Sequence, residues 1–185
     1  MWGNDNNQNQ NHQQYQSRFL SRLSGMEGTT RSDYVTPFKG VTQVRDCKLG
    51  HNRNGREFVA VEFIILSSDT PTTSVGDVRT WMMMTDKDPT GPSLISFFQI
   101  LLDIRRSELT DPMIKSFLTD KPSPLIGMPV RIHARNKVLT NGSDFTILDF
   151  HNLKKLPEGT ELLEFCPPLK NREEVLSQFN SPVPF

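Results

Sequence analysis

The chain has little cysteine and no long apolar stretch, and each absence excludes some classes of protein. Its 185 residues include only Cys47 and Cys166, which cannot build a disulfide framework and fit a reducing compartment. No segment approaches the roughly 18 apolar residues of a membrane span. The first residues also lack the basic start and apolar run of a signal peptide. We therefore expect a cytoplasmic protein that does not enter a membrane.

Net charge and catalytic motifs are absent as well. The chain has 21 Lys and Arg against 21 Asp and Glu, so any affinity for nucleic acid has to come from a local arrangement of charge. No Walker loop, GxSxG or GxGxxG occurs, and the Cys and His residues lack metal-ligand spacing. Asp144, Asp149 and His151 could in principle hold a metal, but a solvated strand face explains them better. We expect no enzyme and no cofactor.

Composition divides the chain into three parts. Residues 1–33 begin with a tract of Asn and Gln that buries too little to offset the cost of ordering, so they are expected to form a disordered tail and linker. Residues 34–156 carry the apolar patterns of a folded domain. Residues 157–185 are rich in proline, with one short helix expected over 172–179 after a cap at Asn171, and read as a C-terminal extension.

Alternating apolar residues predict a domain made mostly of strands. The turn-forming "HNRNG" joins the first two, and Asn141-Gly142 joins the last two, so both pairs should be hairpins. The expected strands cover residues 40–50, 56–66, 78–84, 130–138 and 143–153.

Between the third and fourth strands the apolar period becomes helical. A helix capped by Ser93 is indicated by Leu94, Phe97, Phe98, Leu101 and Ile104. A shorter helix should follow over 112–118, after a cap at Asp111. Five strands with a helix between the third and fourth is the order of the oligonucleotide/oligosaccharide-binding fold, or OB-fold, so a mainly β, five-stranded barrel is predicted.

The fourth strand, "VRIHARNKV", places positive charge on one face. Side chains of a strand alternate between its faces. Val130, Ile132, Ala134 and Val138 occupy even-numbered positions and should therefore face the core. On the other face, Arg131, His133, Arg135 and Lys137 should form a row of positive charge. OB-folds bind ligands on strands two and three, flanked by the first and last hairpin loops. The candidate DNA-binding residues on these elements are Lys48, Arg53, Arg56, Arg79, Trp81, Arg131, His133, Arg135 and Lys137.

Arg and Lys would follow the phosphates, and Trp81 would stack on bases. Each signal also has a plain structural explanation. A charged row protects an edge strand from aggregation, Trp81 fits core or rim packing, the "WMMM" run fits core filling, and Arg53 lies in a solvated turn. The nucleic-acid hypothesis depends on all of these residues sharing one face.

Residues 37–156 resemble the OB-fold single-stranded DNA-binding proteins of bacteriophages and bacteria. The resemblance is carried by "GVTQVRDCKLGHNRNGREFVAVEFIIL", "GDVRTWMMM" and "LIGMPVRIHARNKVLTNGSDFTILDF". Bacterial members end in an acidic tip that closes with Pro-Phe and docks partner proteins. This chain ends in Pro184 and Phe185 but lacks acidic residues there, with Glu173 and Glu174 farther upstream.

The resemblance implies a sequence-tolerant protein that protects single-stranded DNA in replication, recombination or repair and is phage-encoded. It also implies a homo-oligomer or cooperative array, with replication or recombination proteins as partners of the C-terminal end. RNA is a further candidate ligand, since nothing in the sequence distinguishes the sugar. The alternative is an OB-like protein-interaction or virion module that binds no nucleic acid.

Overall fold

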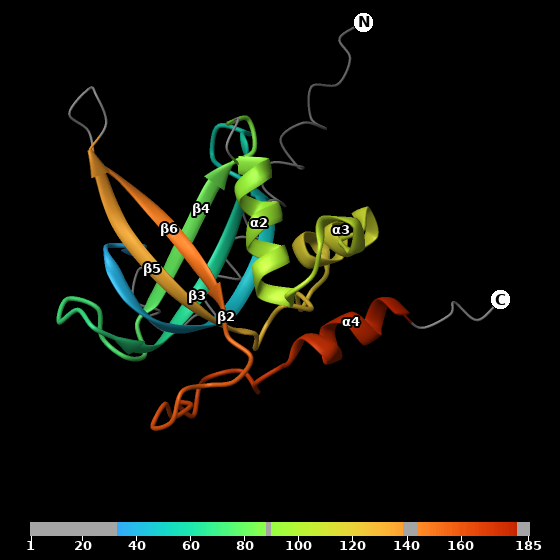
Figure 1. Cartoon of the computed structure of the whole chain (residues 1–185). Coiled ribbons are helices and arrows are strands. Elements are labelled where there is room, and N and C mark those ends of the chain that lie inside the picture. Colours follow the sequence, from blue (N-terminus) through green and yellow to red (C-terminus); the bar gives the residue numbers. More distant parts are fainter. Residues whose placement is uncertain (1–32, 88–89, 139–143, 181–185) are drawn as a thin grey trace, which may run out of the picture. The chain divides into compact units, whose positions relative to one another are not determined.

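The computed structural model describes residues 33–87, 90–138 and 144–180 (Figure 1). The N-terminal tail, the Asn141-Gly142 turn and the Pro-Phe end lie outside the described residues. The strands are β1 (Asp33–Tyr34), β2 (Phe38–His51), β3 (Glu57–Ser68), β4 (Val78–Met84), β5 (Pro129–Val138) and β6 (Asp144–Asn152). The helices are α2 (Thr90–Leu102), a 3-10 turn η1 (Arg106–Glu108), α3 (Asp111–Thr119) and α4 (Arg172–Asn180).

The strands form one sheet in the order β1-β4-β3-β2-β5-β6. All the neighbours are antiparallel except the short β1, which runs parallel to β4. The five predicted strands are confirmed as β2 to β6, with ends that differ by at most two residues. The predicted mainly β class is therefore confirmed.

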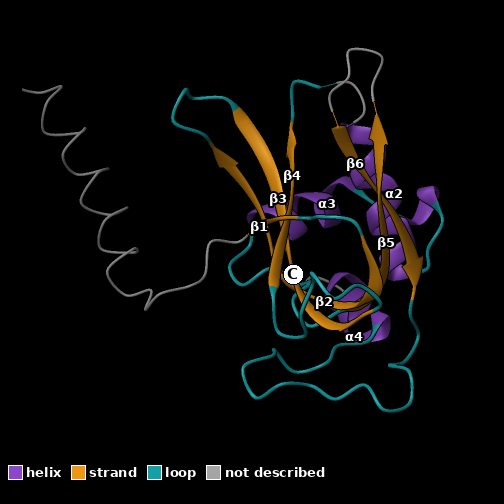
Figure 2. Ribbon diagram, turned by 90° about the vertical axis from the view of Figure 1, so that its left-hand side faces the viewer, coloured by secondary structure: helices purple, strands orange, loops and turns teal. Residues whose placement is uncertain are grey.

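Strand β2 belongs to both halves of the sheet. Its first residues pair with β5 and nearly its whole length pairs with β3, with irregularities after Val41 and Val44 that bend the strand. At Gly40 a Cβ would lie 2.0 Å from the carbonyl oxygen of Ser67, so only glycine permits this close crossing. Figure 2 shows the result, with β3 and β4 on one arm, β5 and β6 on the other, and β2 joining them.

The sheet is not closed, because β4 and β6 share no ladder among the described residues. The barrel that the strand order predicts is therefore not confirmed. Aromatic side chains occupy the seam between these strands instead. The ring centroids of Trp81 on β4 and Phe150 on β6 lie 4.9 Å apart. The ring centroid of Phe97 on α2 lies 5.7 Å from that of Trp81 and 4.8 Å from that of Phe150. Side-chain packing thus joins the two arms where backbone pairing does not.

The helix between β4 and β5 buries the predicted face, with Leu94, Phe97, Phe98 and Leu101 in the core. The predicted cap at Ser93 is wrong, because α2 already includes Thr90, whose hydroxyl donates to the carbonyl of Met84. Proline is tolerated in a first turn, so Pro92 does not delay the helix.

The other two predicted helices are present as well. In α3 the cap position falls on Thr110, and Asp111, predicted as the cap, lies inside the first turn. Asn171 does cap α4, accepting a hydrogen bond from the backbone N–H of Glu174 at 2.9 Å.

A second apolar cluster lies on the other face of the sheet. We call residues 153–171 the C-terminal strap. Its side chains Leu153, Leu156 and Cys166 cover the outward-facing Val41, Ile64 and Leu66. The amide of Gln43, which is fully buried, donates to the carbonyl of Pro167 at 2.8 Å and so anchors the strap. Beyond the strap, Val175 of α4 is buried in the main core. The segment after β6 is therefore packed against the sheet.

Candidate nucleic-acid interface

Strand β5 alternates as its sequence predicts over most of its length. Val130, Ile132 and Ala134 are buried, and Arg131, Arg135 and Lys137 are exposed, with His133 half-buried. Val138, predicted to face the core, is 67% exposed. The prediction fails there because β2 begins at Phe38, opposite Ala134, so the end of β5 beyond Ala134 pairs with β6 alone.

A further cation joins this face from β2. Lys39 lies directly opposite His133 in the ladder, and Val41 lies opposite Arg131. We call the set on this face the cationic row: Lys39, Arg131, His133, Arg135 and Lys137. Lys39 was missed in the sequence because its strand was expected to begin at Gly40. The pairing of β2 with β5, which brings Lys39 here, leaves no local signal in either segment.

Most of the row is uncompensated by carboxylates. Arg135 forms an ion pair with Asp149 of β6, Nε to Oδ2 at 3.0 Å. For Arg131 and Lys137 no carboxylate of a described residue lies within ion-pair distance. Asp69 accepts a hydrogen bond from the backbone N–H of Lys39, which lowers the pKa of that carboxyl and keeps it ionised. The face nevertheless carries a net positive charge on a chain whose overall charge is zero, because the four Lys and Arg residues of the row outnumber the carboxylates of Asp69 and Asp149.

Lys48 differs from the row because its charge is already paired. It lies on β2 with Nζ 2.7 Å from Glu62 and 3.3 Å from Asp46. Burial acts to lower the pKa of Lys48, but the hydrogen bond and charge of Glu62 outweigh it, so the pKa is raised. Asp46 is also 3.6 Å from Lys121. A phosphate at Lys48 would have to displace these carboxylates.

The first hairpin loop presents one free and one paired arginine. Asn52 organises the turn, since its side-chain oxygen accepts from the backbone N–H groups of Asn54 and Arg56. Arg53 is exposed, with no ion pair to a described residue. The guanidinium of Arg56 is bound to Asp86, which follows β4. The loop therefore offers only Arg53 as an uncompensated cation.

Arg79 and Trp81 point to the inner face of the sheet. They lie opposite Phe63 and Val61 in the β3–β4 ladder, and both of these are core residues. Arg79 is 9% exposed and its guanidinium lies 2.9 Å from Asp77, so it is not accessible to a phosphate. Trp81 is half-buried in the aromatic seam, as the core interpretation of this residue expects.

The candidate residues therefore do not share one face. The inner faces of both arms meet in the single main core, so their outer faces point away from each other (Figure 2). The cationic row lies on the outer face of the β5–β6 arm, whereas Lys48 is on the outer face next to β3. The prediction that all the candidate residues lie on one surface is wrong. The structure brings together only the cationic row, which consists of the four candidate residues on β5 and Lys39.

The outer face of the β3–β4 arm carries an apolar stripe whose residues are not among those predicted from the sequence to bind DNA. Phe58 lies opposite Met84, and Ala60 lies opposite Met82, which is 39% exposed. A Cβ at Gly50 would lie 2.9 Å from the tip of the Phe58 ring, so glycine at this position leaves room for the ring. The alternation of Met82 and Met84 against Trp81 was the available signal. The stripe is an exposed apolar surface on which a base could stack.

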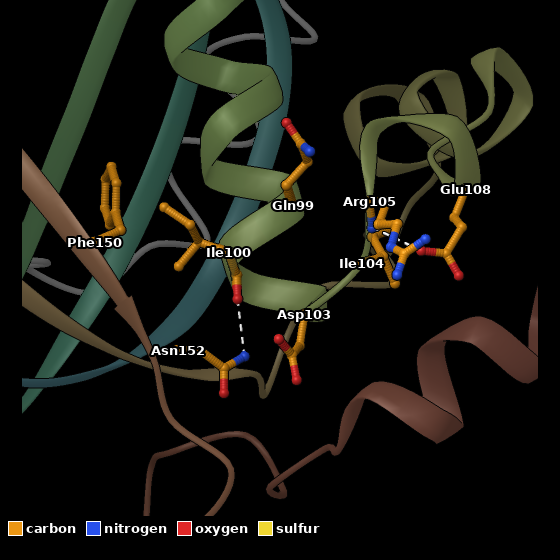
Figure 3. A pocket seen from close by; sticks show the side chains of 8 residues that line it. All are labelled: Gln99, Ile100, Asp103, Ile104, Arg105, Glu108, Phe150 and Asn152. Atoms are coloured by element: carbon orange, nitrogen blue, oxygen red, sulfur yellow. Dashed lines mark hydrogen bonds between the residues drawn. The ribbon is translucent and has the colours of Figure 1, made fainter.

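A shallow cavity of about 530 Å³ lies where the end of α2 meets the end of β6 (Figure 3). Apolar Ile100, Ile104 and Phe150 line it together with charged Asp103, Arg105 and Glu108. Asn152 closes one side by donating to the carbonyl of Ile100 at 2.8 Å. Glu108 accepts from the backbone N–H of Arg105 at 2.7 Å, so its carboxylate is already engaged. The mixed charge of this lining favours neither an anion nor a cation.

No protein-family model matches the chain, and no curated protein matches it. Within the described ranges, no group of three or more His, Cys, Asp or Glu side chains could hold a metal ion. Among the same residues, each helix is too short or too polar to cross a bilayer.

Proposed function

We propose that the protein binds single-stranded nucleic acid through the cationic row, as a sequence-tolerant single-stranded DNA-binding protein of the OB-fold class. The strand order of β2 to β6, the sharing of β2 between two arms and the helix between β4 and β5 support this assignment. The aromatic seam at Trp81 and Phe150 stands where an OB-fold would close its barrel by pairing. In this proposal side chains replace the closing ladder.

The observation that carries the proposal is the row itself. A strand places every second side chain about 6.6 Å apart on one face, so Arg131, His133, Arg135 and Lys137 form a line of donors along β5. Lys39 widens the line from the neighbouring strand. Cations on long side chains bind phosphates without reading bases, which accounts for sequence tolerance. The single ion pair within the row, Arg135 with Asp149, is exposed and contributes at most about 1 kcal/mol, so a phosphate could compete with it.

The direct test is binding of the full-length protein to labelled oligo(dT), followed by fluorescence anisotropy across a series of salt concentrations. Each phosphate contact with a single strand contributes about −0.7 to the slope of log K against log salt. With three to four contacts we expect a slope of about −2 to −3, and similar affinities for oligo(dT), oligo(dC) and a mixed sequence. A slope near zero, or a demand for one defined sequence, would overturn the proposal.

The biological setting follows from the same proposal. A sequence-tolerant binder would coat exposed DNA during replication, recombination or repair in the cytoplasm of a host cell, as a phage-encoded protein. The matching test with oligo(U) asks whether RNA is bound equally well. The C-terminal Pro184-Phe185 pair is proposed to contact replication or recombination proteins. Removal of both residues should leave oligo(dT) affinity unchanged if that role is separate.

A second candidate, a protein-interaction module, is favoured by exposed apolar side chains on the C-terminal strap, among them Phe165 at 63% exposure. Large exposed apolar groups that cluster often mark protein contacts. The two candidates are distinguished by the anisotropy measurement, because the interaction module alone predicts no binding of oligonucleotide at any salt concentration.

A further inference from the structure

The C-terminal strap and the loop before β4 form an exposed surface with a distinct composition. Val75 is 53% exposed, Leu162 37% and Phe165 63%. A Cβ at Gly76 would lie 3.2 Å from Leu163 and 3.4 Å from Phe165, so the loop and the strap are in direct contact here. We call this surface the acidic-apolar patch, and it comprises Val75, Leu162 and Phe165 with the carboxylates Glu158, Glu161 and Glu164.

The carboxylates of the patch are exposed and unpaired. Glu158, Glu161 and Glu164 form no ion pair with any described residue. Two of them directly precede the apolar residues Leu162 and Phe165 in the sequence, so charge and apolar surface alternate along the strap. A complementary ligand would alternate cations with apolar side chains. Such a ligand would cover the exposed ring of Phe165 and neutralise the carboxylates beside it.

One segment of the chain has this composition. "SRFLSRL", residues 17–23, interleaves Arg18 and Arg22 with Phe19, Leu20 and Leu23. Between Asp5 and Glu27 the sequence contains no acidic residue, so nothing in that stretch would offset the arginines. No other exposed surface of the described residues combines several unpaired carboxylates with large apolar side chains.

We propose that the acidic-apolar patch of one molecule binds residues 17–23 of a second copy of this chain. The contact joins two different surfaces, so it is heterologous, and once it has formed one molecule keeps its segment unused and the other keeps its patch unused. Two molecules that exchange segments satisfy both surfaces and close a dimer, and without that exchange the contact builds rings or open chains of molecules. The inference concerns protein–protein contact alone and does not depend on nucleic-acid binding.

The test uses sedimentation equilibrium of the full-length protein without nucleic acid. We expect the weight-average mass to rise continuously with protein concentration, and the association to weaken as salt is raised, because exposed charges are screened within about 8–10 Å. A mass that stays at the monomer value over the whole concentration range would overturn the proposal. So would an association that neither charge-reversal pair described below weakens, because the contact would then lie elsewhere.

Charge reversal makes the test specific. Arg18→Glu with Arg22→Glu should weaken self-association at least tenfold, and Glu161→Arg with Glu164→Arg should do the same, because each places like charges together. Mixing the two variants should restore association, since the acidic segment of one then meets the basic patch of the other. Mixtures that remain monomeric would contradict the proposal. Folding of each variant is checked by its melting temperature.

An apolar substitution provides a matched control. Phe165→Ser should weaken self-association at least tenfold, whereas Val138→Ser, at an equally exposed apolar residue on β5, should leave it unchanged. Equal loss from both substitutions would show that the contact does not lie on the strap. Binding of oligo(dT) is measured in a separate experiment. A variant that loses self-association but still binds oligo(dT) can therefore be told apart from one that self-associates but no longer binds oligo(dT).

Discussion

Arg131 and Ile132 are neighbours in the sequence, but they lie on opposite faces of β5 and should have separable roles. Arg131 is exposed in the cationic row, and Ile132 is fully buried. Arg131→Ala with Lys137→Ala should weaken oligo(dT) binding equally for all sequences and flatten the salt slope by about 1.4, at about 0.7 per lost contact. The free energy of unfolding should change by less than about 0.5 kcal/mol.

The matched control for this pair is Lys115→Ala, which removes an exposed cation from α3. It should alter neither affinity nor slope. Ile132→Ala should instead destabilise the fold by about 2–5 kcal/mol, because it leaves a cavity in the core. If the folded double variant of Arg131 and Lys137 kept its full affinity for oligo(dT), the interface would not lie on the cationic row. The stripe around Phe58 and Met82 would then be the next candidate.

Trp81 should behave as a structural residue. Its ring contacts Phe97 and Phe150 at the seam between the two arms. Trp81→Ala should therefore lower the free energy of unfolding by about 3 kcal/mol, as measured by urea denaturation. Met82→Ala, on the opposite face of the same strand, should cost less than about 1 kcal/mol. A stable Trp81→Ala protein that has lost oligo(dT) binding would instead establish base stacking.

The two cysteines should differ in reactivity. Burial raises the pKa of the Cys47 thiol to about 12, with the charge of Asp46 adding to the effect. The thiol therefore stays protonated and inert at pH 8, since the thiolate is the nucleophile. Cys166, which belongs to the strap, is only half-buried. Alkylation of the native protein by iodoacetamide, followed by mass spectrometry, should label Cys166 first, and equal labelling would contradict the packing described here.

At the scale of elements, the strap is held by contacts that require glycine. Gly127 has φ +96 and a Cβ there would lie 2.3 Å from the carbonyl oxygen of Pro168. Its own carbonyl accepts from the amide of Gln43 and from the backbone N–H of Lys170. Gly127→Ala should therefore release the strap, lower the free energy of unfolding by about 2–4 kcal/mol and increase proteolysis between residues 157 and 171.

Gly159 provides the control for this substitution. It also has a positive φ, +79, but no atom lies within 4 Å of the position of its Cβ. Gly159→Ala should cost only the backbone strain of about 1–2 kcal/mol and leave the strap closed. If both variants are cleaved at the same rate, contact between Gly127 and Pro168 does not hold the strap in place.

At the scale of the whole molecule, stability and binding should depend differently on salt. The core is apolar, and the ion pairs of the described residues are mostly exposed, each contributing about 0–1 kcal/mol. The melting temperature should thus change by only a few degrees between 0.05 and 0.5 M salt. Over the same range the affinity for oligo(dT) should fall about 100-fold or more, at the expected slope of −2 to −3. Parallel loss of both would show that binding depends on the overall fold and not on the row.

The sequence by itself determined the local elements of this protein. The period of two in β2 to β6 and the helical period from Leu94 to Leu101 are properties of neighbouring residues, and they predict both the strands and the buried face of α2. The alternation of Arg131 and Ile132 is likewise local. The Asn-Gly turn after β2 follows from backbone preferences at Asn54 and Gly55, where φ is +75.

Tertiary structure alone decided which surfaces these elements form. Periodicity separates the two faces of a strand but does not say which one is inside, so Trp81 and Arg79 could not be assigned from β4 alone. The addition of Lys39 to the row depends on pairing between segments that lie far apart in the chain. Exposure of Val138 depends on where β2 begins, and neutralisation of Lys48 depends on Glu62 of the neighbouring strand β3. Local patterns carry no information about such contacts, because the contacts arise only when distant segments pack together.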